Sequence, residues 1–327
     1  MTLIDREGAR RHPVGGPSSP RRRGIGIEFA GLTALISGFS VFVNGYGVRQ
    51  FDDATTYTTA KNLIAASLIG ATLMAWRSRS GPRRPHPPPV AFMPLHRRWL
   101  AFAAVAVIGG SVPFVLFFEG LSRASSTDAA FIHKTLVAWV AVLAVIVLRE
   151  RLTVLHYVAI GLILWGQAVT MGGVGFPEFG RGELLILAAT LCWSVEVVLA
   201  RYVLARGVDE LSLGAARMLG GVGLLLAWAV LRGKWGDLAS LTAGQWRWAA
   251  LTGVFLTGFV ITWHFALARA QAVDVTAVLV IGAVVTSLLN AGLRDFALRP
   301  VGLVLLTMGA LLGGAAASRP RPRLRTT

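Results

Sequence analysis

The chain has 327 residues, of which 54% are hydrophobic and only 15% are charged, and its mean hydropathy is +0.63. Soluble domains carry roughly 45–50% apolar and about 25% charged residues, so this composition excludes an ordinary soluble protein and indicates one that is solvated by a lipid bilayer. The net charge of +16 does not indicate nucleic acid binding, because the basic residues lie in the tails and between apolar runs instead of on one amphipathic face.

Both ends of the chain and one internal stretch are too polar to lie in a membrane. Residues 1–23 are predicted to be a disordered basic tail, and residues 318–327 form a second basic tail. The stretch 77–98, RSRSGPRRPHPPPVAFMPLHRR, cannot span a bilayer and is predicted to be one long cytoplasmic loop. The single cysteine, Cys192, lies within an apolar run and cannot form a disulfide inside the chain.

Between these stretches the chain is a succession of continuous apolar runs. Each run is close to the ~20 residues that a helix needs to cross the ~30 Å hydrocarbon core of a bilayer. The runs are residues 26–47, 57–76, 99–120, 128–148, 154–173, 182–205, 211–231, 246–267, 273–292 and 298–317. The predicted fold class is therefore an all-α integral membrane protein of about ten transmembrane helices.

The distribution of Lys and Arg predicts the orientation of this bundle. If the N-terminus is cytoplasmic, twenty-one basic residues of the tails and loops lie inside and nine lie outside. The remaining two, Lys134 and Arg217, lie within helices. We therefore expect a multi-pass protein of the bacterial cytoplasmic membrane with both termini in the cytoplasm.

The second part of the chain repeats features of the first. Three segments recur in the same order: LSRASSTDAA at 121–130 as LARAQAVDVT at 267–276, VLRERL at 147–152 as GLRDFA at 292–297, and IGLIL at 160–164 as VGLVL at 301–305. We predict one five-helix unit over 24–173 and a second over 174–317. Because five is odd, the second unit must lie upside down relative to the first. Inverted repeats are typical of secondary transporters, whose substrate site lies near the membrane midplane between the halves.

The stretch 140–169, VAVLAVIVLRERLTVLHYVAIGLILWGQAV, resembles the fourth helix, acidic turn and fifth helix of EamA-type transporters in the drug/metabolite transporter superfamily. The resemblance is good over 99–173 and looser over 182–317, and Leu136 stands where many members have a proline. It implies a ten-helix bundle with both termini inside, a cavity between the halves, and no ATPase. The chain has no GxxxxGK[ST] phosphate-binding motif.

Charged side chains inside the apolar runs are candidates for function, because each costs ~2.5–3.5 kcal/mol to insert on translocon scales. At ~1.5 Å per residue, Glu196 lies roughly 20 Å from the outer end of the sixth run, and Arg217 lies ~9 Å from the inner end of the seventh. Since the two depths are similar, we predict that these side chains meet. The pair either balances charge and fixes packing, or supplies a protonatable carboxylate that couples proton flow to transport.

A second group of polar side chains lies in the outer half of the predicted bundle. Lys134 is ~9 Å from the outer end of the fourth run, beside His133, and its helix offers no acidic partner three or four positions away. Asn44 and Glu119 lie at comparable depth, and Trp139 either packs or forms an aromatic wall. We predict that these five residues line a substrate site in which Lys134 attracts a carboxylate or phosphate. In the alternative interpretation, Lys134 extends outward to water or pairs with Glu119.

The predicted function is secondary transport of a small organic metabolite or drug-like solute by alternating access. Proton coupling, export as the direction, and the oligomeric state stay open. The alternatives are a polytopic enzyme acting on lipid, which would need acids, bases or metal ligands gathered at one membrane face, and a membrane scaffold. We expect no enzymatic activity, no cofactor and no metal, since His133, His156 and His264 are far apart in the sequence. The expected partners are a small-molecule solute and the lipid bilayer, with no nucleic acid.

Overall fold

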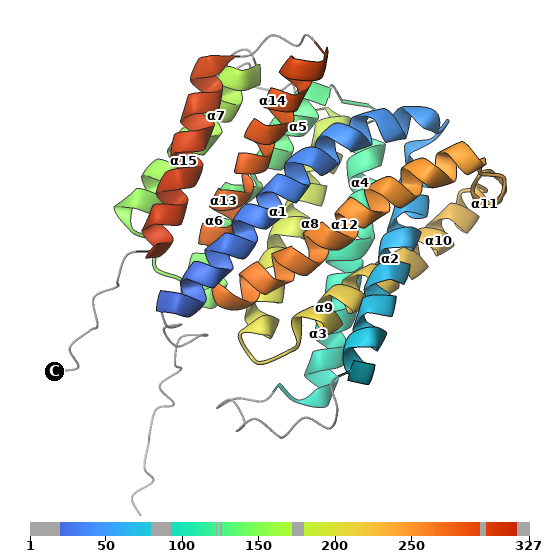
Figure 1. Ribbon diagram of the computed structural model, residues 1–327, viewed down its shortest axis with the longest axis horizontal. Helices are drawn as coiled ribbons and strands as arrows, with labels where there is room; N and C mark the ends of the chain where they lie inside the picture. Colours follow the sequence, from blue (N-terminus) through green and yellow to red (C-terminus); the bar gives the residue numbers. More distant parts are fainter. Residues whose placement is uncertain are drawn as a thin grey trace, which may run out of the picture.

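The computed structural model describes residues 20–79, 93–121, 123–124, 126–171, 180–294 and 299–318. Most of the two predicted tails and of the predicted 77–98 loop lies outside these residues. Within the described ranges every regular element is helical (Figure 1).

The first half of the chain forms five rods, two of which consist of several helical pieces. Its elements are α1 (Pro20–Gly47), η1 (Val48–Gln50), α2 (Ala54–Arg79), α3 (Leu95–Gly110), α4 (Val112–Leu121), α5 (Ser126–Lys134), α6 (Leu136–Leu143), η2 (Ala144–Leu148) and α7 (Val154–Met171). The pairs α3–α4 and α5–α6, the latter with η2, each make one rod.

The second half follows the same plan. Its elements are α8 (Arg181–Leu204), α9 (Glu210–Ala215), η3 (Ala216–Gly220), α10 (Gly221–Leu231), α11 (Trp235–Ala239), α12 (Ala243–Arg269), α13 (Ala272–Leu279), α14 (Ile281–Arg294) and α15 (Pro300–Ser318). Here α9, η3 and α10 make one rod, α13 and α14 make another, and the short α11 connects two rods.

Eight segments of the described chain are long and apolar enough to cross a membrane. The two other rods do not meet this requirement of length and apolar composition, each for a different reason. The apolar stretch of α7 that counts, Val154–Thr170, is shorter than 18 residues, whereas α2 has 26 residues but carries a polar run, TTYTTAKN, at 55–62. The predicted all-α membrane fold is confirmed, with eight of the predicted spans meeting the requirement in full.

The two halves run in opposite directions. The helix α1 begins at the end of the bundle where the chain also finishes, whereas α8 begins at the opposite end (Figure 1). The rods are interrupted at matching positions, at Thr135 between α5 and α6 and at Val280 between α13 and α14. Neither break contains a proline. At the first break the Thr135 hydroxyl donates to the Ile132 carbonyl at 2.6 Å, a bond that competes with the helical hydrogen-bond pattern.

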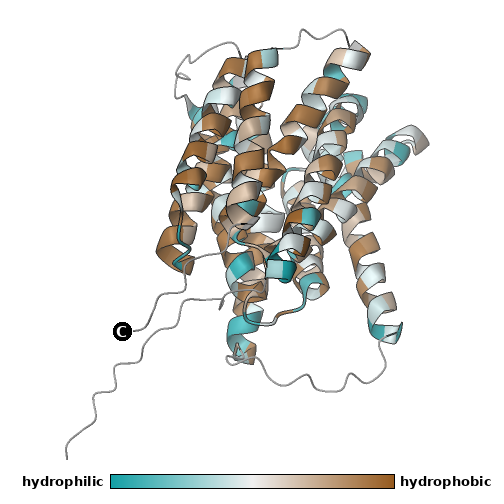
Figure 2. Cartoon of the chain, turned by 60° about the vertical axis from the view of Figure 1, so that its left-hand side comes forward, coloured by the Kyte–Doolittle hydropathy of each residue, from teal (hydrophilic) through white to brown (hydrophobic). Residues whose placement is uncertain are grey.

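The halves pack into one another over the length of the bundle. The helix α1 lies against α12, α7 lies against α15, and α4 lies against α8. The largest apolar core includes Val140, Ala200 and Ala266, which are fully buried. Figure 2 shows hydrophobic residues along the helices and hydrophilic residues concentrated toward their ends. Apolar residues therefore cover the outside as well as the core, as expected for a bundle surrounded by lipid.

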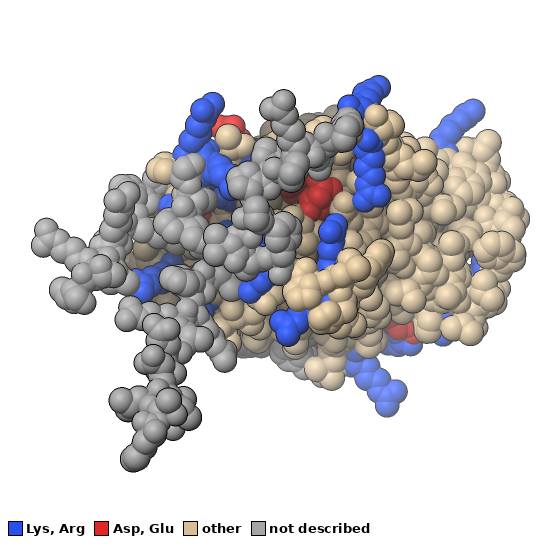
Figure 3. Space-filling model, turned by 90° about the horizontal axis from the view of Figure 1, so that it is seen from below, with Lys and Arg blue, Asp and Glu red and all other residues tan. Residues whose placement is uncertain are grey.

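The end of the bundle where the described chain both starts and finishes is rich in arginine. Exposed arginines at this end include Arg79, Arg97, Arg149 and Arg151. Figure 3 views this end directly and shows basic side chains around it, with only a few acidic ones. We call it the basic end, and the opposite one the far end.

Candidate functional site

A buried ion pair joins α8 to η3 inside the bundle. Arg217 Nε lies 3.7 Å from Glu196 Oε1, and the two side chains are 9% and 1% exposed. Arg217 Nη2 also donates to the carbonyl of Gly109 in α3 at 3.3 Å. The arginine lies in a π-helical turn, which inserts an extra residue into the helix and is frequent at functional sites. Glu196 and Arg217, which the sequence places at a similar depth in the membrane, are therefore neighbours in the structure.

Two glycines at the end of α3 allow the helices around this pair to approach closely. A Cβ atom at Gly109 would lie 2.5 Å from Glu196 Cγ. At Gly110 it would overlap the backbone oxygen of Arg217 and lie 2.9 Å from the Cα of Gly221. The absence of side chains at these positions brings α3 against both α8 and η3.

An aromatic cluster adjoins the ion pair. We define it as Phe114, Phe117, His133 and Trp193. The Trp193 ring centroid lies 5.0 Å from that of His133, 5.7 Å from that of Phe117 and 5.4 Å from that of Phe114. Trp193 Nε1 donates to the Gly109 carbonyl at 3.3 Å, the same oxygen that accepts from Arg217. One carbonyl therefore links the aromatic cluster to the ion pair.

Several polar atoms in this region lack hydrogen-bond partners. Among the described residues, His133 Nδ1, Glu196 Oε1 and Arg217 Nε are buried and accept or donate no hydrogen bond. Buried polar groups are nearly always paired in folded proteins, so each exception requires an explanation. Glu196 Oε1 and Arg217 Nε are the two atoms of the 3.7 Å ion pair, whereas His133 Nδ1 has no such partner among the described residues.

Lys134 follows His133 directly, at the last position of α5. It is half-buried, and within the described part of the chain it makes no hydrogen bond or ion pair. Trp139, one turn further along, is 38% exposed and donates from Nε1 to the Thr135 hydroxyl at 3.1 Å. Trp139 does not join the aromatic cluster, whereas His133 belongs to it through contacts with Phe117 and Trp193.

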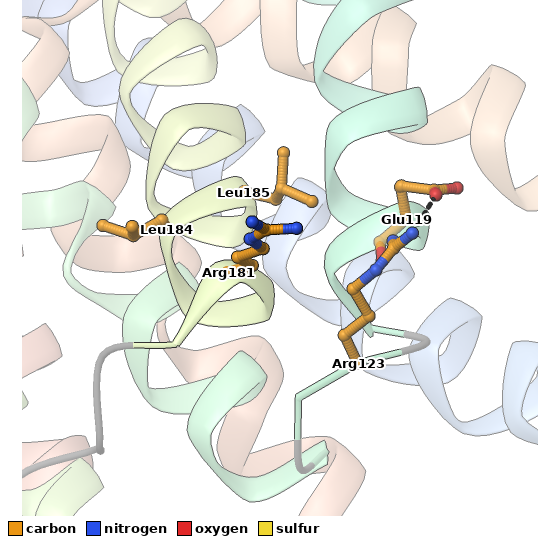
Figure 4. Close-up of a pocket in the computed structure, with 5 residues that line it drawn as sticks. All are labelled: Glu119, Arg123, Arg181, Leu184 and Leu185. Atoms are coloured by element: carbon orange, nitrogen blue, oxygen red, sulfur yellow. Dashed lines mark hydrogen bonds and ion pairs between the residues drawn. The ribbon is translucent and has the colours of Figure 1, made fainter.

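Glu119 lies at the far end of the bundle and has a partner other than Lys134. Its carboxylate pairs with Arg123 one turn later at 2.6 Å. With Arg181, Leu184 and Leu185 these residues line a pocket of about 450 Å³ between α4 and the start of α8 (Figure 4). The pocket places two arginines and one carboxylate at the surface of the far end.

Asn44 belongs to a separate polar group between α1 and α2. Its Oδ1 accepts from the Tyr57 hydroxyl at 2.6 Å and from Lys61 Nζ at 3.2 Å, and its Nδ2 donates to the Ser40 carbonyl at 2.6 Å. The Lys61 ammonium also lies 5.2 Å from the centre of the Tyr57 ring. The structure thus gives Asn44 a set of partners distinct from the aromatic cluster.

Sequence reasoning missed Trp193 and Phe117 as parts of the candidate site and counted Lys61 among the loop residues. A signal existed for Trp193, which lies three positions before Glu196 and therefore on the same face of the helix. A similar spacing relates Tyr57 to Lys61, four positions apart on α2. Phe117 offered no such signal, because its contacts come from other helices.

Comparisons with known proteins agree with this architecture. The EamA-like transporter family matches residues 24–172 and 180–313, which include most of both halves. A protein of Methanothermobacter thermautotrophicus (strain Delta H), named an uncharacterized transporter, is 26% identical over 139 residues. That match spans 41% of this chain and 40% of the relative's length.

A solved crystal structure shares the fold, with a TM-score of 0.68 over 89% of this chain and 96% of the other chain at 18% identity. The resemblance that the sequence predicts is confirmed by the family match, which extends over far more than half of the residues. This chain, a multi-pass membrane protein, belongs to the EamA-like transporter family.

Proposed function

We propose that the chain is a secondary transporter that carries a small organic solute with a carboxylate or phosphate group by alternating access. The observation that carries this proposal is Lys134, a half-buried cation without a partner among the described residues, next in sequence to the aromatic cluster. A cation inside a membrane bundle is costly unless water or an anion compensates it. A bound anion at Lys134 provides that compensation.

The aromatic cluster, which includes the sequence neighbour of Lys134, supports a solute with a flat apolar body. Phe117 and Trp193 offer ring surfaces, and His133 Nδ1 offers an unused hydrogen-bonding position. Binding sites for small molecules typically combine such apolar walls with a few polar groups that fix the orientation. In this proposal the Glu196–Arg217 pair forms the floor of the site and is balanced in charge.

The inverted halves provide the means of transport. We propose that the five-helix units over 24–173 and 174–317 rock against one another around the solute, exposing it to one side of the membrane at a time. The basic end is then cytoplasmic, since cytoplasmic loops carry the excess of Lys and Arg. Family membership supports a membrane carrier over an enzyme that acts on lipid.

Solute binding tests the proposal. A bound solute raises the melting temperature of the folded protein by mass action, so a panel of small carboxylates and phosphates, each with an aromatic or aliphatic body, is screened against the purified chain in detergent. We expect at least one aromatic member to raise the Tm. Lys134→Met should abolish that rise and leave the solute-free Tm near wild type, whereas Lys134→Arg should keep part of it.

Lys61→Met is the matched control, because it removes a second lysine of the bundle whose ammonium is already bound by Asn44 at 3.2 Å. This variant should lower the solute-free Tm and keep the rise on adding solute. A Lys134→Met protein that responds to solute as the wild type does would show that Lys134 is structural, and the anion site would be withdrawn.

A further inference from the structure

A second cluster of titratable side chains lies toward the basic end, where the two halves of the chain meet. We define the interhalf cluster as Glu150, His156, Arg201 and Asp274. Glu150 follows η2, His156 lies in the first turn of α7, Arg201 lies in the last turn of α8, and Asp274 lies in the first turn of α13. Glu150, His156 and Asp274 are 8%, 1% and 0% exposed, and the Arg201 side chain is 13% exposed.

The contacts of this cluster cross from one half to the other. His156 Nε2 lies 2.9 Å from Asp274 Oδ1. The Ala272 backbone N–H donates to Glu150 Oε1 at 3.2 Å, and Arg201 Nε lies 3.9 Å from the same oxygen. The acidic turn of the first half therefore contacts the segment of the second half that carries Asp274. Both segments belong to the internal repeat, and the inverted arrangement brings them together at this end.

The hydrogen bonds of His156 show which ring nitrogen carries the proton. The Thr153 backbone N–H donates to His156 Nδ1 at 3.0 Å, so Nδ1 is an acceptor. The ring proton is then on Nε2, from which it is donated to Asp274. His156 is neutral in this arrangement and does not offset the charge of either carboxylate.

The cluster has one negative charge in excess when both carboxylates are ionised, because Arg201 is its only cation. Arg22 in α1 also interacts with Arg201, but Arg22 is exposed. An unpaired buried charge is expensive, and such groups commonly take up a proton instead. One oxygen of each carboxylate, Glu150 Oε2 and Asp274 Oδ2, is buried without a hydrogen-bond partner among the described residues.

The electrostatics of Glu150 agree with the charge count. Burial raises the pKa of Glu150 to about 7, against the lowering effects of the Arg201 guanidinium and the Ala272 N–H, and the charge of Asp274 adds to the rise. Two other carboxylates differ in having one arginine each: the buried Glu196 lies beside Arg217, and the half-buried Glu210 pairs with Arg269 at 2.8 Å.

We propose that the interhalf cluster is the proton-binding site of this transporter, holding one proton on Glu150 while the basic end is closed. When the halves separate there, water reaches Glu150, its O–H bond breaks and the proton passes to that water, leaving the carboxylate ionised. This inference rests on the proposed function and names its coupling ion. The sequence suggests Glu196 as the residue that couples proton flow to transport. We assign that role to Glu150 instead.

The sign of the pH dependence follows from proton linkage. A hydrated glutamate has a pKa of about 4.3, whereas Glu150 in the closed arrangement has one of about 7. The closed arrangement binds the proton more tightly, so its stabilisation is complete at low pH and is lost as the pH rises through about 7.

Thermal unfolding of the full chain in detergent tests the site without any solute. The wild-type Tm should fall by about 2–4 °C or more between about pH 6 and 8, and Glu150→Gln should show no such fall. Glu210→Gln is the matched control and should keep the fall, because Glu210 belongs to a one-to-one pair at the same end. A fall in Glu150→Gln equal to that of the wild type overturns the proposal.

Asp274→Asn provides an independent check, particularly if Glu150→Gln does not fold. It removes the charge that adds to the rise of the Glu150 pKa and leaves the burial that is its main cause, so the fall in Tm should remain and shift to lower pH. A fall in Asp274→Asn at the same pH as in the wild type overturns the proposal in the same way.

A thiol placed at the basic end tests whether proton release accompanies opening. Ala270→Cys, in a Cys192→Ala background, replaces a side chain that is 1% exposed and lies against Gly26 of α1. The rate at which this thiol reacts with a charged methanethiosulfonate is measured in two proteins, one with Glu150 and one with Glu150→Gln. Dividing the first rate by the second cancels the effect of pH on the ionisation of the thiol. The ratio should rise about tenfold between about pH 6 and 8.

A ratio that does not change with pH would overturn the gating role. Neither measurement depends on solute, so the two proposals fail separately. If the wild-type Tm does not change with pH and the protein binds solute at Lys134, the proton site alone is refuted. A steep, Glu150-dependent Tm in a protein that neither binds nor carries any solute refutes the proposed function alone.

Discussion

At the scale of single residues, the Glu196–Arg217 pair and the aromatic cluster share one hydrogen-bond acceptor, the Gly109 carbonyl. The rise per residue of a helix places Glu196 and Arg217 at one level, and the structure sets them 3.7 Å apart. The partners of His133 could not be predicted in this way, because Trp193 and Phe117 reach it from other helices. Which rings meet depends on the rotation of each helix about its axis, and no sequence spacing records that rotation.

The Glu196–Arg217 pair makes a prediction at this scale. Glu196→Gln or Arg217→Met alone should destabilise the protein by about 3–5 kcal/mol, because each leaves the partner as an uncompensated buried charge. The double variant should recover much of that loss, as measured by thermal or chemical unfolding in detergent. Losses that simply add in the double variant would show that the two side chains do not interact.

An exposed pair serves as the control for this cycle. Lys234 and Asp237 lie 3.0 Å apart, with side chains 41% and 53% exposed. Water and salt screen such a pair, so Lys234→Met and Asp237→Asn should leave the midpoint of unfolding unchanged. A large change there would mean that the assay reports something other than buried charge.

At the scale of helices, the apolar runs predict the rods to within a few residues, since a run of about 20 apolar residues has few other uses. The breaks were not predictable. Thr135 and Val280 interrupt their rods without a proline, and at Thr135 a hydroxyl that bonds the Ile132 carbonyl at 2.6 Å changes the local pattern. Threonine in a membrane helix often makes such bonds without breaking the helix, so the residue type alone does not indicate the interruption.

The close approach of α3 to η3 makes the prediction at this scale. Gly110→Ala should destabilise the protein by about 1–3 kcal/mol, because the new methyl group meets backbone atoms of Arg217 and Gly221 that cannot move aside easily. Gly223→Ala, one turn further along the same rod as η3, adds a methyl group with no atom within 4 Å. That control should be neutral, or stabilising by up to about 1 kcal/mol. Equal effects of the two substitutions on the unfolding midpoint would contradict the tight helix contact.

At the scale of the whole molecule, the sequence carries more than its local patterns suggest. The short matches between LSRASSTDAA and LARAQAVDVT, and between VLRERL and GLRDFA, indicate a repeat, and an odd number of helices per unit implies inversion. The structure shows what this inversion brings together. The acidic turn of one half and Asp274 of the other meet at the basic end, where Ala272 N–H bonds Glu150 Oε1 at 3.2 Å. This meeting depends on how the halves dock, which no sequence alignment of the repeat contains.

Flux into vesicles measures directly whether this molecule moves an anionic organic solute across a membrane. The purified chain is reconstituted into liposomes, and uptake of labelled carboxylates and phosphates is followed with and without a pH gradient. We expect saturable uptake of at least one aromatic member above protein-free liposomes, and its loss in Lys134→Met. Wild-type vesicles that contain folded protein and take up every member no faster than protein-free liposomes would contradict it.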